Sequence, residues 1–474
     1  MPTILGGGAL TEGYSISNSL RMDQTSDSGL TKTFSSDGNR KKFTIAKWLK
    51  VDAAFGYIAG TQTSGQEYFQ YGFTDTGTIR VFQGDGSLNV ETSRTFGDAS
   101  AWYHIVLQID TTQGTNTNRV KFYINGEQET SYSSTTYPSQ NLDLFFNKDT
   151  HAFGVGNRGD LQGGEIKGYL ADYYFVDNAT VAPSVFAETD DNGIWVPKDS
   201  ADVIDNVTFG TNGFFMNFQE TGTSANSSGM GADTSGNDNH FAATNITGAV
   251  DVTTDTPTNS FATLNPLTNS EMTFSEGMTK TVRGGTNGQF ATSTFETNKG
   301  KWYFESKLLN YSGNSRPTIG LSQSHKTFAS ALASTSNNRV YYLLETSYYQ
   351  SNSASAVTVN SSPATNDIYM WAVDLDNLKF YIGKNGTWLH SSDPSAGNNG
   401  LTIEAADYYA VATGPNDNGT DTSRNNEWLF NFGNPGYSIS SGNADGKGFG
   451  NFEYAVPSGF FSYCTKNLAQ FGWG

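Results

Sequence analysis

The chain has 474 residues and a formal charge of −18, from 28 basic against 46 acidic side chains, with a sequence pI near 4.6. Because such an acidic surface repels phosphate backbones and anionic lipid, we expect no nucleic-acid partner and no membrane insertion. Glycine (52 residues) and aromatic residues (14%) are abundant and charged residues are few (16%), which favours strands and turns over helices.

The N-terminal region, residues 1–17, begins MPTILGGGALTEG and is predicted to be an anchoring arm. It has neither the basic start nor the apolar run of a signal peptide, and no stretch of about 18 apolar residues occurs in the sequence. The chain has one cysteine, Cys464, so no internal disulfide can form. These features are typical of a protein made in a reducing cytosol.

Residues 18–200 are predicted to form a first β-sandwich. In residues 103–110 (YHIVLQID) every second side chain is apolar, as in a strand that packs one face on a core. The next run, residues 120–124 (VKFYI), ends in Asn125 and Gly126, which tolerate the positive φ of a two-residue hairpin turn. Strand, tight turn and strand follow one another here.

Residues 163–189 (GGEIKGYLADYYFVDNATVAPSVFAET) are predicted to be a strand covered on both faces, followed by a short helical turn. Regular alternation places Asp172 and Tyr174 on one face and Tyr173 on the other. Asp172 and Asp177 then point to opposite faces of the strand and lie about 16 Å apart along it, so they cannot act together as a catalytic pair. We expect Asp172 to bond nearby backbone or a cation.

Motifs for catalysis are scarce. Residues 154–159 (GVGNRG) match G-x-G-x-x-G, but a turn and a strand follow instead of the helix that a dinucleotide site requires, so we predict a glycine-rich turn. The sequence has neither the Glu-x-Asp-x-x-Glu of a sandwich glycosidase nor a G-x-S-x-G elbow. Five histidines are scattered singly, without transition-metal spacing: His104, His151, His240, His325 and His390. We therefore predict no enzymatic activity, no catalytic residue and no bound organic cofactor.

Calcium is the one cofactor for which the sequence offers candidates. The stretch DTSGNDN is dense in oxygen ligands, and Asp233, Asn237 and Asp238 are the candidate ligands within it. The stretch lacks the twelve-residue spacing and the closing glutamate of an EF-hand. An ordinary polar turn is the other interpretation.

A second sandwich is predicted downstream. Residues 201–266 are poor in large apolar side chains and are predicted to be a long connecting segment packed on or between the domains. Residues 267–440 repeat the strand and turn pattern, with LKFYIGKNG turning at Asn385 and Gly386. Residues 441–474 form a C-terminal segment. The predicted fold class is all-β, with two antiparallel β-sandwiches.

Several stretches, taken in order, resemble a known family. NSLRMD, RKKFTIAKWLKVD, WYHIVLQIDTTQGTNTNRVKFYINGEQ and GEIKGYLADYYFVDNATVAPSVFAE are similar to a laminin G-like, concanavalin A-like lectin module of tailed bacteriophages, especially marine ones. GKWYFE, YMWAVDLDNLKFYIGKNGTW and PSGFFSYCTKNL resemble the second half of the same phage proteins, a SPRY-type sandwich. The resemblance implies two concanavalin A-like, jelly-roll sandwiches.

The same resemblance implies a role. It predicts a non-enzymatic virion protein of the tail fibre or receptor-binding type, located in the virion and contacting host glycans through sandwich loops. Its expected partners are other tail or capsid proteins and further copies of itself, with a trimer favoured. A head decoration, fibre or adaptor that bridges virion subunits is the alternative, and a glycan depolymerase is a remote one.

The resemblance carries no sugar-binding residue onto this sequence. Residues 345–353 (ETSYYQSNS) nevertheless combine rings that could stack on sugars with amides that could bind hydroxyls. Tyr348, Tyr349 and Asn352 are the predicted ligand-binding residues. In the other interpretation, the tyrosines pack against a neighbouring sheet or subunit.

Overall fold

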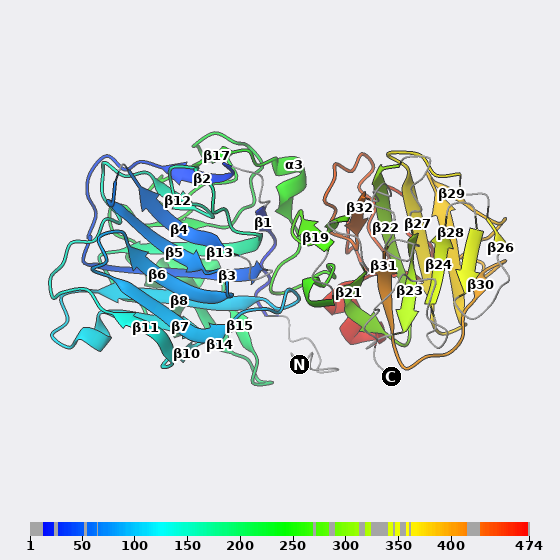
Figure 1. The fold of residues 1–474 in the computed structure, drawn as a ribbon, viewed down its shortest axis with the longest axis horizontal. Helices are drawn as coiled ribbons and strands as arrows, with labels where there is room; N and C mark the ends of the chain where they lie inside the picture. The colour runs from blue at the N-terminus through cyan, green and yellow to red at the C-terminus, as the bar shows by residue number, and fades with distance from the viewer. Residues whose placement is uncertain are drawn as a thin grey trace. The chain divides into compact units, whose positions relative to one another are not determined.

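The computed structural model describes residues 13–22, 27–51, 55–63, 65–268, 272–283, 290–311, 318–323, 340–344, 347–350, 357–359, 362–414 and 427–472. They form two compact units, and the chain passes from the first to the second between Thr258 and Asn259. Each unit contains two large, mainly antiparallel β-sheets (Figure 1), so the predicted all-β fold is confirmed. None of the helices within the described ranges is both long and apolar enough to span a bilayer.

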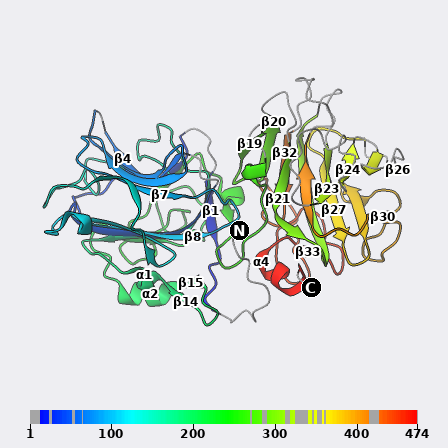
Figure 2. The same ribbon diagram turned by 60° about the horizontal axis from the view of Figure 1, so that its bottom comes forward.

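The first unit is a sandwich of two eight-stranded sheets, seen edge-on in Figure 2. In the sheet that contains β13, the strand order is β10 (Glu127–Gln128), β9 (Val120–Ile124), β8 (Tyr103–Asp110), β3 (Lys42–Val51), β13 (Gly168–Asp177), β1 (Ser19–Met22) and β18 (Val252–Thr253), and β16 (Phe214–Met216) also pairs with β13. In the opposite sheet, the order is β11 (Tyr132–Thr136), β7 (Asn89–Thr95), β6 (Thr78–Gln83), β5 (Tyr68–Phe73), β4 (Gly56–Gln62), β12 (Phe153–Val155), β2 (Gly29–Lys32) and β17 (Ala242–Thr244).

The space between these sheets is filled by apolar and aromatic side chains. Phe146 lies at the centre of a group of rings, with its centroid 4.5 Å from that of Phe69 and 4.5 Å from that of Phe153. From β8, the residues Ile105 and Leu107 enter this core, as their alternation in the sequence predicts. Asn125 turns the chain from β9 to β10 at a φ of 49°, which confirms the predicted hairpin.

Strand β13 does not follow the regular alternation predicted for it. Its pairing with β3 shifts between Ala171 and Tyr174, so that Asp172 and Tyr173 together face a single residue of β3. This is a β-bulge, and Asp172 takes the left-handed φ of 43° that such a bulge requires. Beyond it, Tyr173 points into the core and Tyr174 to the outer face, as members of two separate apolar clusters. Tyr173 and Tyr174 thus lie on opposite faces, as predicted, but the extra residue reverses the alternation relative to the residues before the bulge, so that Leu170 shares the core face with Tyr173 and not the face of Tyr174.

Short elements cover the outer face of the β13 sheet (Figure 2). They are α1 (Pro183–Phe186), β14 (Ala187–Thr189), β15 (Trp195–Pro197) and α2 (Ser200–Asn206). Helix α1 begins at Pro183, where the missing N–H costs no hydrogen bond. Helix α2 is capped by Asp199, whose carboxylate accepts the backbone N–H of Ala201 at 2.9 Å. The sheet is thus buried on both faces, as predicted for β13. The sequence predicts only one packed face for β8, but the covering elements also bury its His104 and Val106 on the outer side.

Residues 201–258 belong to the first unit instead of joining two domains. They contribute β16, β17, the short α3 (Gly248–Asp251) and β18, all paired with or packed on earlier strands of the first unit. Two ion pairs hold the end of this segment. Lys50 Nζ lies 2.9 Å from Asp255 Oδ2, and Arg21 Nε lies 3.4 Å from Asp251 Oδ1. The predicted connecting segment therefore lies mostly within the first sandwich, because its apolar and charged side chains find partners there.

The second unit is also a sandwich. Its nine-stranded sheet has the order β19 (Met272–Ser275), β20 (Lys280–Arg283), β32 (Glu427–Asn431), β22 (Lys301–Asn310), β27 (Ile368–Asp374), β28 (Lys379–Lys384) and β29 (Thr387–Trp388), with β30 (Leu401–Thr402) beside β28 and β33 (Phe461–Ser462) beside β22. Its six-stranded sheet has the order β21 (Ala291–Thr297), β31 (Tyr409–Thr413), β23 (Thr318–Gln323), β24 (Val340–Leu344), β25 (Ser347–Gln350) and β26 (Val357–Thr358). Short helical turns occupy Asn116–Asn118 in the first unit, and Pro266–Thr268, Thr465–Asn467 (α4) and Leu468–Gly472 in the second.

Buried rings also form the core of the second unit, among them Trp302 and Trp371. Asn385 makes the predicted hairpin turn at a φ of 48°. On the outer face of the nine-stranded sheet, the C-terminal segment contributes Phe452 and Phe460 to a second apolar cluster. The C-terminal segment is therefore an integral layer of this unit.

Candidate functional site

A buried carboxylate organises one end of the first sandwich. Asp177, the last residue of β13, accepts the backbone N–H of Asn39 at 2.7 Å and the side-chain amide of Asn147 at 2.8 Å through one oxygen. Its other oxygen accepts the backbone N–H of Asn212 at 3.3 Å. Asp177 thus ties together three loops that are far apart in the sequence.

The side-chain amides of Asn147 and Asn212 complete the junction of these three loops. Asn212 donates to the backbone oxygen of Ser36 at 3.0 Å and to the side-chain oxygen of Asn147 at 2.9 Å. A side chain at Gly38 would clash with the Asn147 amide, because a Cβ there would lie 2.2 Å from its Nδ2. The glycine therefore allows the loop after β2 to approach closely, and the junction is a rigid base for the residues outside it.

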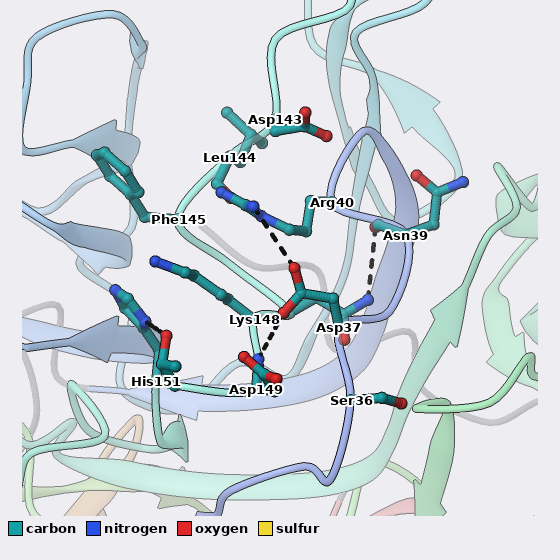
Figure 3. A network of polar contacts seen from close by, with 12 residues as sticks. Ser36, Asp37, Asn39, Arg40, Asp143, Leu144, Phe145, Lys148, Asp149 and His151 are labelled. Carbon is teal, nitrogen blue, oxygen red and sulfur yellow. Dashed lines mark hydrogen bonds and ion pairs between the residues drawn. The ribbon is translucent and has the colours of Figure 1, made fainter.

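Charged side chains surround this junction and form a surface that we call the polar rim, shown in part in Figure 3. The rim consists of Asp37, Arg40, Lys41, Glu67, Asp143, Lys148 and Asp149. All of these residues come from loops next to strands, and their side chains are half-buried or exposed.

Backbone hydrogen bonds hold the centre of the rim. Arg40 donates through Nε to the carbonyl oxygen of Leu144 at 2.8 Å, and its Nη1 lies 3.5 Å from Asp37 Oδ2 (Figure 3). The backbone N–H of Asp149 donates to Asp37 at 2.9 Å. That hydrogen bond and the Arg40 charge hold the pKa of Asp37 below its usual value. Asp37 is therefore a fixed, ionised hydrogen-bond acceptor at neutral pH.

Looser ion pairs form the outer part of the rim. Lys148 Nζ lies 3.3 Å from Glu67 Oε2, and Lys41 Nζ lies 3.7 Å from Asp143 Oδ1. Beside them the ring of Phe145 stacks on His151, with parallel planes and centroids 6.4 Å apart. Burial and the Lys148 charge lower the pKa of His151, so this ring is neutral at pH 7. The rim offers carboxylates and a guanidinium, with the half-buried ring of Phe145 beside them, and these groups recognise polyhydroxylated ligands.

The predicted calcium residues lie in a turn at the same end of the sandwich. Asp233 is buried, and its carboxylate accepts three backbone N–H groups, from Phe215, Ser235 and Asn239, at 2.8 to 2.9 Å. Asn237 donates its side-chain amide to two backbone carbonyls of the neighbouring loop.

Asp238, the third candidate, is exposed, and its carboxylate lies 3.7 Å from the ring of His240. Among the described residues, no three His, Cys, Asp or Glu side chains are grouped so that they could hold a metal ion. This placement favours the interpretation as a polar turn, and calcium there stays a prediction.

The predicted sugar-binding tyrosines are only partly within the described residues. Tyr348 lies on β25 and is 5% exposed, with its ring centroid 6.2 Å from that of Phe380. Its hydroxyl donates to the backbone oxygen of Thr402 at 3.4 Å. For Tyr348 this favours the packing interpretation. For Tyr349 the structure describes only the backbone, which pairs with Tyr342, and Asn352 lies outside the described residues.

Asp172 is buried on the same strand as Asp177 but has different surroundings. It is 2% exposed on the outer side of the β13 sheet, near Tyr14, Tyr174 and Asp199. Burial, with a smaller effect from the Asp199 charge, raises the pKa of Asp172 to about 8. A carboxyl that is neutral at pH 7 and covered by packed side chains cannot reach a substrate at the surface.

The other candidates from the sequence have structural roles. His104 is buried and accepts the indole N–H of Trp195 at 3.1 Å, and burial lowers its pKa to about 3. Gly154 and Val155 end β12, and residues 156–159 form a turn after it, in which Asn157 Oδ1 accepts the backbone N–H of Gly159 at 2.5 Å. This turn leads into β13, so the predicted glycine-rich turn is confirmed.

Cys464 is expected to be unreactive in the folded chain. It is fully buried, and burial raises its pKa to about 11, so almost no thiolate forms at neutral pH. A thiol reagent such as Ellman's reagent should label less than about 1% of the native protein in the time that labels the urea-unfolded chain completely. Equal labelling rates in both states would contradict the prediction.

The sequence did not single out the polar rim. Asp37, Arg40 and Asp149 have no motif or spacing in common, and 112 residues separate Asp37 from Asp149 along the chain. The only local signal is that Asp and Asn are frequent in the segments that precede β3 and β12. The rim exists because the loops that precede β3, β5 and β12 meet at one end of the first sandwich.

Part of the chain matches a known protein family. Residues 23–185 match the laminin G type of the concanavalin A-like lectin/glucanases superfamily. No curated protein is similar enough to match the chain. Similar solved structures include the SPRY domain of human HERC1, at 12% identity and a TM-score of 0.26, covering 32% of this chain and 87% of that one.

Two further solved structures are similar at low identity. The TRIM65 PSpry domain is 10% identical with a TM-score of 0.27, covering 36% of this chain and 91% of that one. Domains LG4–5 of the mouse laminin α1 chain are 10% identical with a TM-score of 0.29, covering 89% of this chain and 90% of that one. The chain is thus an all-β protein whose residues 23–185 are similar to the concanavalin A-like lectins and glucanases.

Proposed function

We propose that the chain binds glycans without catalysing a reaction on them, and that the polar rim of the first unit is the binding surface. The observation that carries the proposal is the combination of a lectin-type sequence match over residues 23–185 with a rim of charged side chains at the loop end of that sandwich. Carboxylates accept the hydroxyl protons of sugars, and Arg40 donates to their oxygens. The base formed by Asp177 holds these groups in place before the ligand arrives.

Binding is favoured over hydrolysis by the electrostatics of the rim. A glycosidase needs one carboxyl with a raised pKa to protonate the leaving group and a second carboxylate across the bond. In the rim, Asp37 has a lowered pKa, and Glu67 and Asp143 each lie beside a lysine. Asp172 has the raised pKa but lies beneath packed side chains.

In its biological setting, the chain is proposed to be a virion protein of a tailed phage, of the tail fibre or receptor-binding type. Support comes from the ordered series of phage-type stretches along the sequence, from NSLRMD to PSGFFSYCTKNL. Its proposed partners are other virion proteins, host surface glycans and further copies of the chain in a trimer. Purified protein should then block adsorption of the phage. Particles that weaken when the gene is deleted, while the purified protein leaves adsorption unchanged, would support a head decoration or adaptor instead.

The double variant Asp37→Asn, Arg40→Gln should weaken glycan binding by at least about tenfold, because each change removes a charge-assisted hydrogen bond to the ligand. The wild-type chain is first screened on an array of bacterial surface glycans, and the dissociation constant of the best binder is then measured by calorimetry. The double variant Glu188→Gln, Lys198→Gln is the matched control. It removes an exposed ion pair of 3.6 Å on the outer side of the same sandwich and should leave affinity unchanged. An array without any bound glycan would contradict the proposal, as would equal affinities of the two variants.

A further inference from the structure

The first sandwich has one sheet face on which no described helix or strand packs. The covering elements α1, β14, β15 and α2 lie below β8 in Figure 2, on the far side from β7. On β5, β6 and β7, the side chains that alternate with core residues such as Phe69 and Val81 point to the uncovered side. We call this side the open face, and its half-buried residues are Tyr68, Gln70, Arg80, Phe82, Asn89 and Glu91.

Two aromatic rings lie next to each other on the open face. The ring centroids of Tyr68 on β5 and Phe82 on β6 are 5.9 Å apart. Gln70 is the residue of β5 that pairs with Phe82, so its side-chain amide lies on the same face. Half-buried rings beside an amide suit a sugar, because the rings pack on its C–H groups and the amide binds its hydroxyls.

Arg80 is the group on the open face that indicates a particular ligand. Its guanidinium lies over the Phe82 ring, 5.0 Å from the centroid, but makes no hydrogen bond or ion pair with any described residue. The residue opposite it on β7 is Glu91, whose carboxylate accepts the Thr78 hydroxyl at 2.7 Å instead. On β5 its neighbour is Gly72, which has no side chain to cover the guanidinium.

The other arginines of the first unit are all bound. Each of them contacts a carboxylate or a backbone oxygen: Arg21, Arg40, Arg94, Arg119 and Arg158. In a chain with 46 acidic and 28 basic side chains, a half-buried arginine without a partner among the described residues stands out. A guanidinium that lies on a ring presents a rigid planar fork, which matches the two oxygens of a carboxylate.

We infer that the open face binds a sugar ring that bears a carboxylate, a hexuronate, with the carboxylate on Arg80 and the ring against Tyr68 and Phe82. The inference rests on the proposed glycan binding by the first unit and names the class of glycan. Glu67 of the polar rim directly precedes Tyr68, so the open face continues the rim and one glycan chain can contact both. The carboxylate of the sugar supplies the negative partner that the protein does not give to Arg80.

Matched sugars test the inference on the full chain. The probes are the methyl glycosides of glucuronate and galacturonate and those of glucose and galactose, which carry CH₂OH in place of the carboxylate. Saturation-transfer NMR titrations give the dissociation constants. At least one uronate should bind about tenfold more tightly than its neutral counterpart, as expected for a bidentate ion pair on a half-exposed face. Equal affinities within both pairs would overturn the inference.

Variants of Arg80 assign the preference to this side chain. Arg80→Gln should weaken uronate binding about tenfold and leave the affinity for neutral sugars within about twofold. Arg80→Lys keeps the charge without the planar fork and should show an intermediate preference. Arg94→Gln is the matched control, because it removes an exposed arginine from β7 of the same sheet and should change neither affinity. A uronate preference that persists in Arg80→Gln would overturn the inference. So would tighter binding of glucose 6-phosphate than of both uronates, since Arg80 would then recognise phosphate.

The rim variant separates this inference from the proposed function. If the sugars bind without a uronate preference and are lost in Asp37→Asn, Arg40→Gln, the rim remains the glycan site and the assignment of the open face is overturned. If a uronate preference survives in that variant and is lost in Arg80→Gln, the open face is supported even where the rim binds nothing. If none of the four sugars binds the wild-type chain, the inference is overturned.

Discussion

Replacing Asp172 with asparagine should raise the free energy of unfolding of the first unit by up to about 4 kcal/mol at pH 7, and by almost nothing below pH 4. The gain arises because Asp172 is 2% exposed and its pKa is raised from 3.8 to about 8, chiefly by burial. Asparagine has the same shape without a charge, and it tolerates the left-handed φ of 43° at the bulge. Calorimetry of the full chain at several pH values, with hydrogen exchange to assign the transition to the first unit, measures the effect.

The sign of the pH dependence follows from proton binding. Between about pH 4 and pH 8 the folded chain holds a proton on Asp172 that the unfolded chain has lost. Stability contributed by this residue is therefore complete below pH 4, decreases as the pH rises to about 8, and is constant above it. Asp199, which caps α2, adds to this pH dependence because its charge raises the pKa of Asp172 further. The hydroxyls of Tyr14, which donates to Ser200, and of Tyr174 on the same strand leave it unchanged. The variant should lack this decrease.

Asp177→Asn is the matched control on the same strand. Asp177 is also buried, but its two oxygens accept three N–H groups, so an amide in its place would turn an NH₂ group toward donors. We expect this variant to lose about 3 kcal/mol and to loosen the loops below the polar rim. If Asp172→Asn and Asp177→Asn changed the free energy of unfolding in the same direction, this account of β13 would be contradicted.

Glu305→Gln should destabilise the second unit by about 3 to 5 kcal/mol and detach the C-terminal segment from its sheet. Glu305 is fully buried on β22, and each of its oxygens accepts a backbone N–H, from Tyr454 at 2.8 Å and from Glu453 at 3.0 Å. Glutamine has a single acceptor oxygen, so its NH₂ must face one of these two donors. The hydroxyls of Tyr303 and Tyr437 also donate to the carboxylate and would lose a charged partner.

Hydrogen exchange by mass spectrometry locates this effect. In Glu305→Gln, the amides of residues 437–461 should exchange faster before the rest of the second unit does. Glu453→Gln is the control in the same segment, because that carboxylate is half-buried and, among the described residues, accepts from Ser440 alone, so its loss should cost less than about 1 kcal/mol. Protection of residues 437–461 that is unchanged in Glu305→Gln would show that the apolar contacts alone hold the segment.

Much of the fold could be predicted because strand periodicity and turn chemistry depend on neighbouring residues. The alternation in residues 103–110 predicts the buried face of β8, and Asn125 and Asn385 predict two hairpins by their tolerance of positive φ. The absence of a helix after residues 154–159 identifies a turn in the same way. Each of these inferences uses information within about ten residues.

The candidate sites needed contacts across the chain. Tyr348 is a ring in a polar stretch of the sequence, but the pairing of β24 with β25 and of β28 with β30 buries it against Phe380. Asp233 is one of several acidic residues in a turn, and only the neighbouring loop supplies the N–H groups that occupy its oxygens. The sequence shows these side chains, but it does not show which residues become their neighbours in the folded chain.

By itself, the sequence determined an all-β chain with two sandwiches, tight turns at Asn-Gly steps and no motif for catalysis. Only the tertiary structure decided that residues 201–258 complete the first sandwich, that a bulge at Asp172 reverses the faces of β13, and that Asp37, Arg40 and Asp149 meet at one edge. The physical reason is the range of the interactions. Alternation and turn preferences act between neighbours, whereas a bulge, a buried carboxylate and a rim of loops depend on what lies across the sheet.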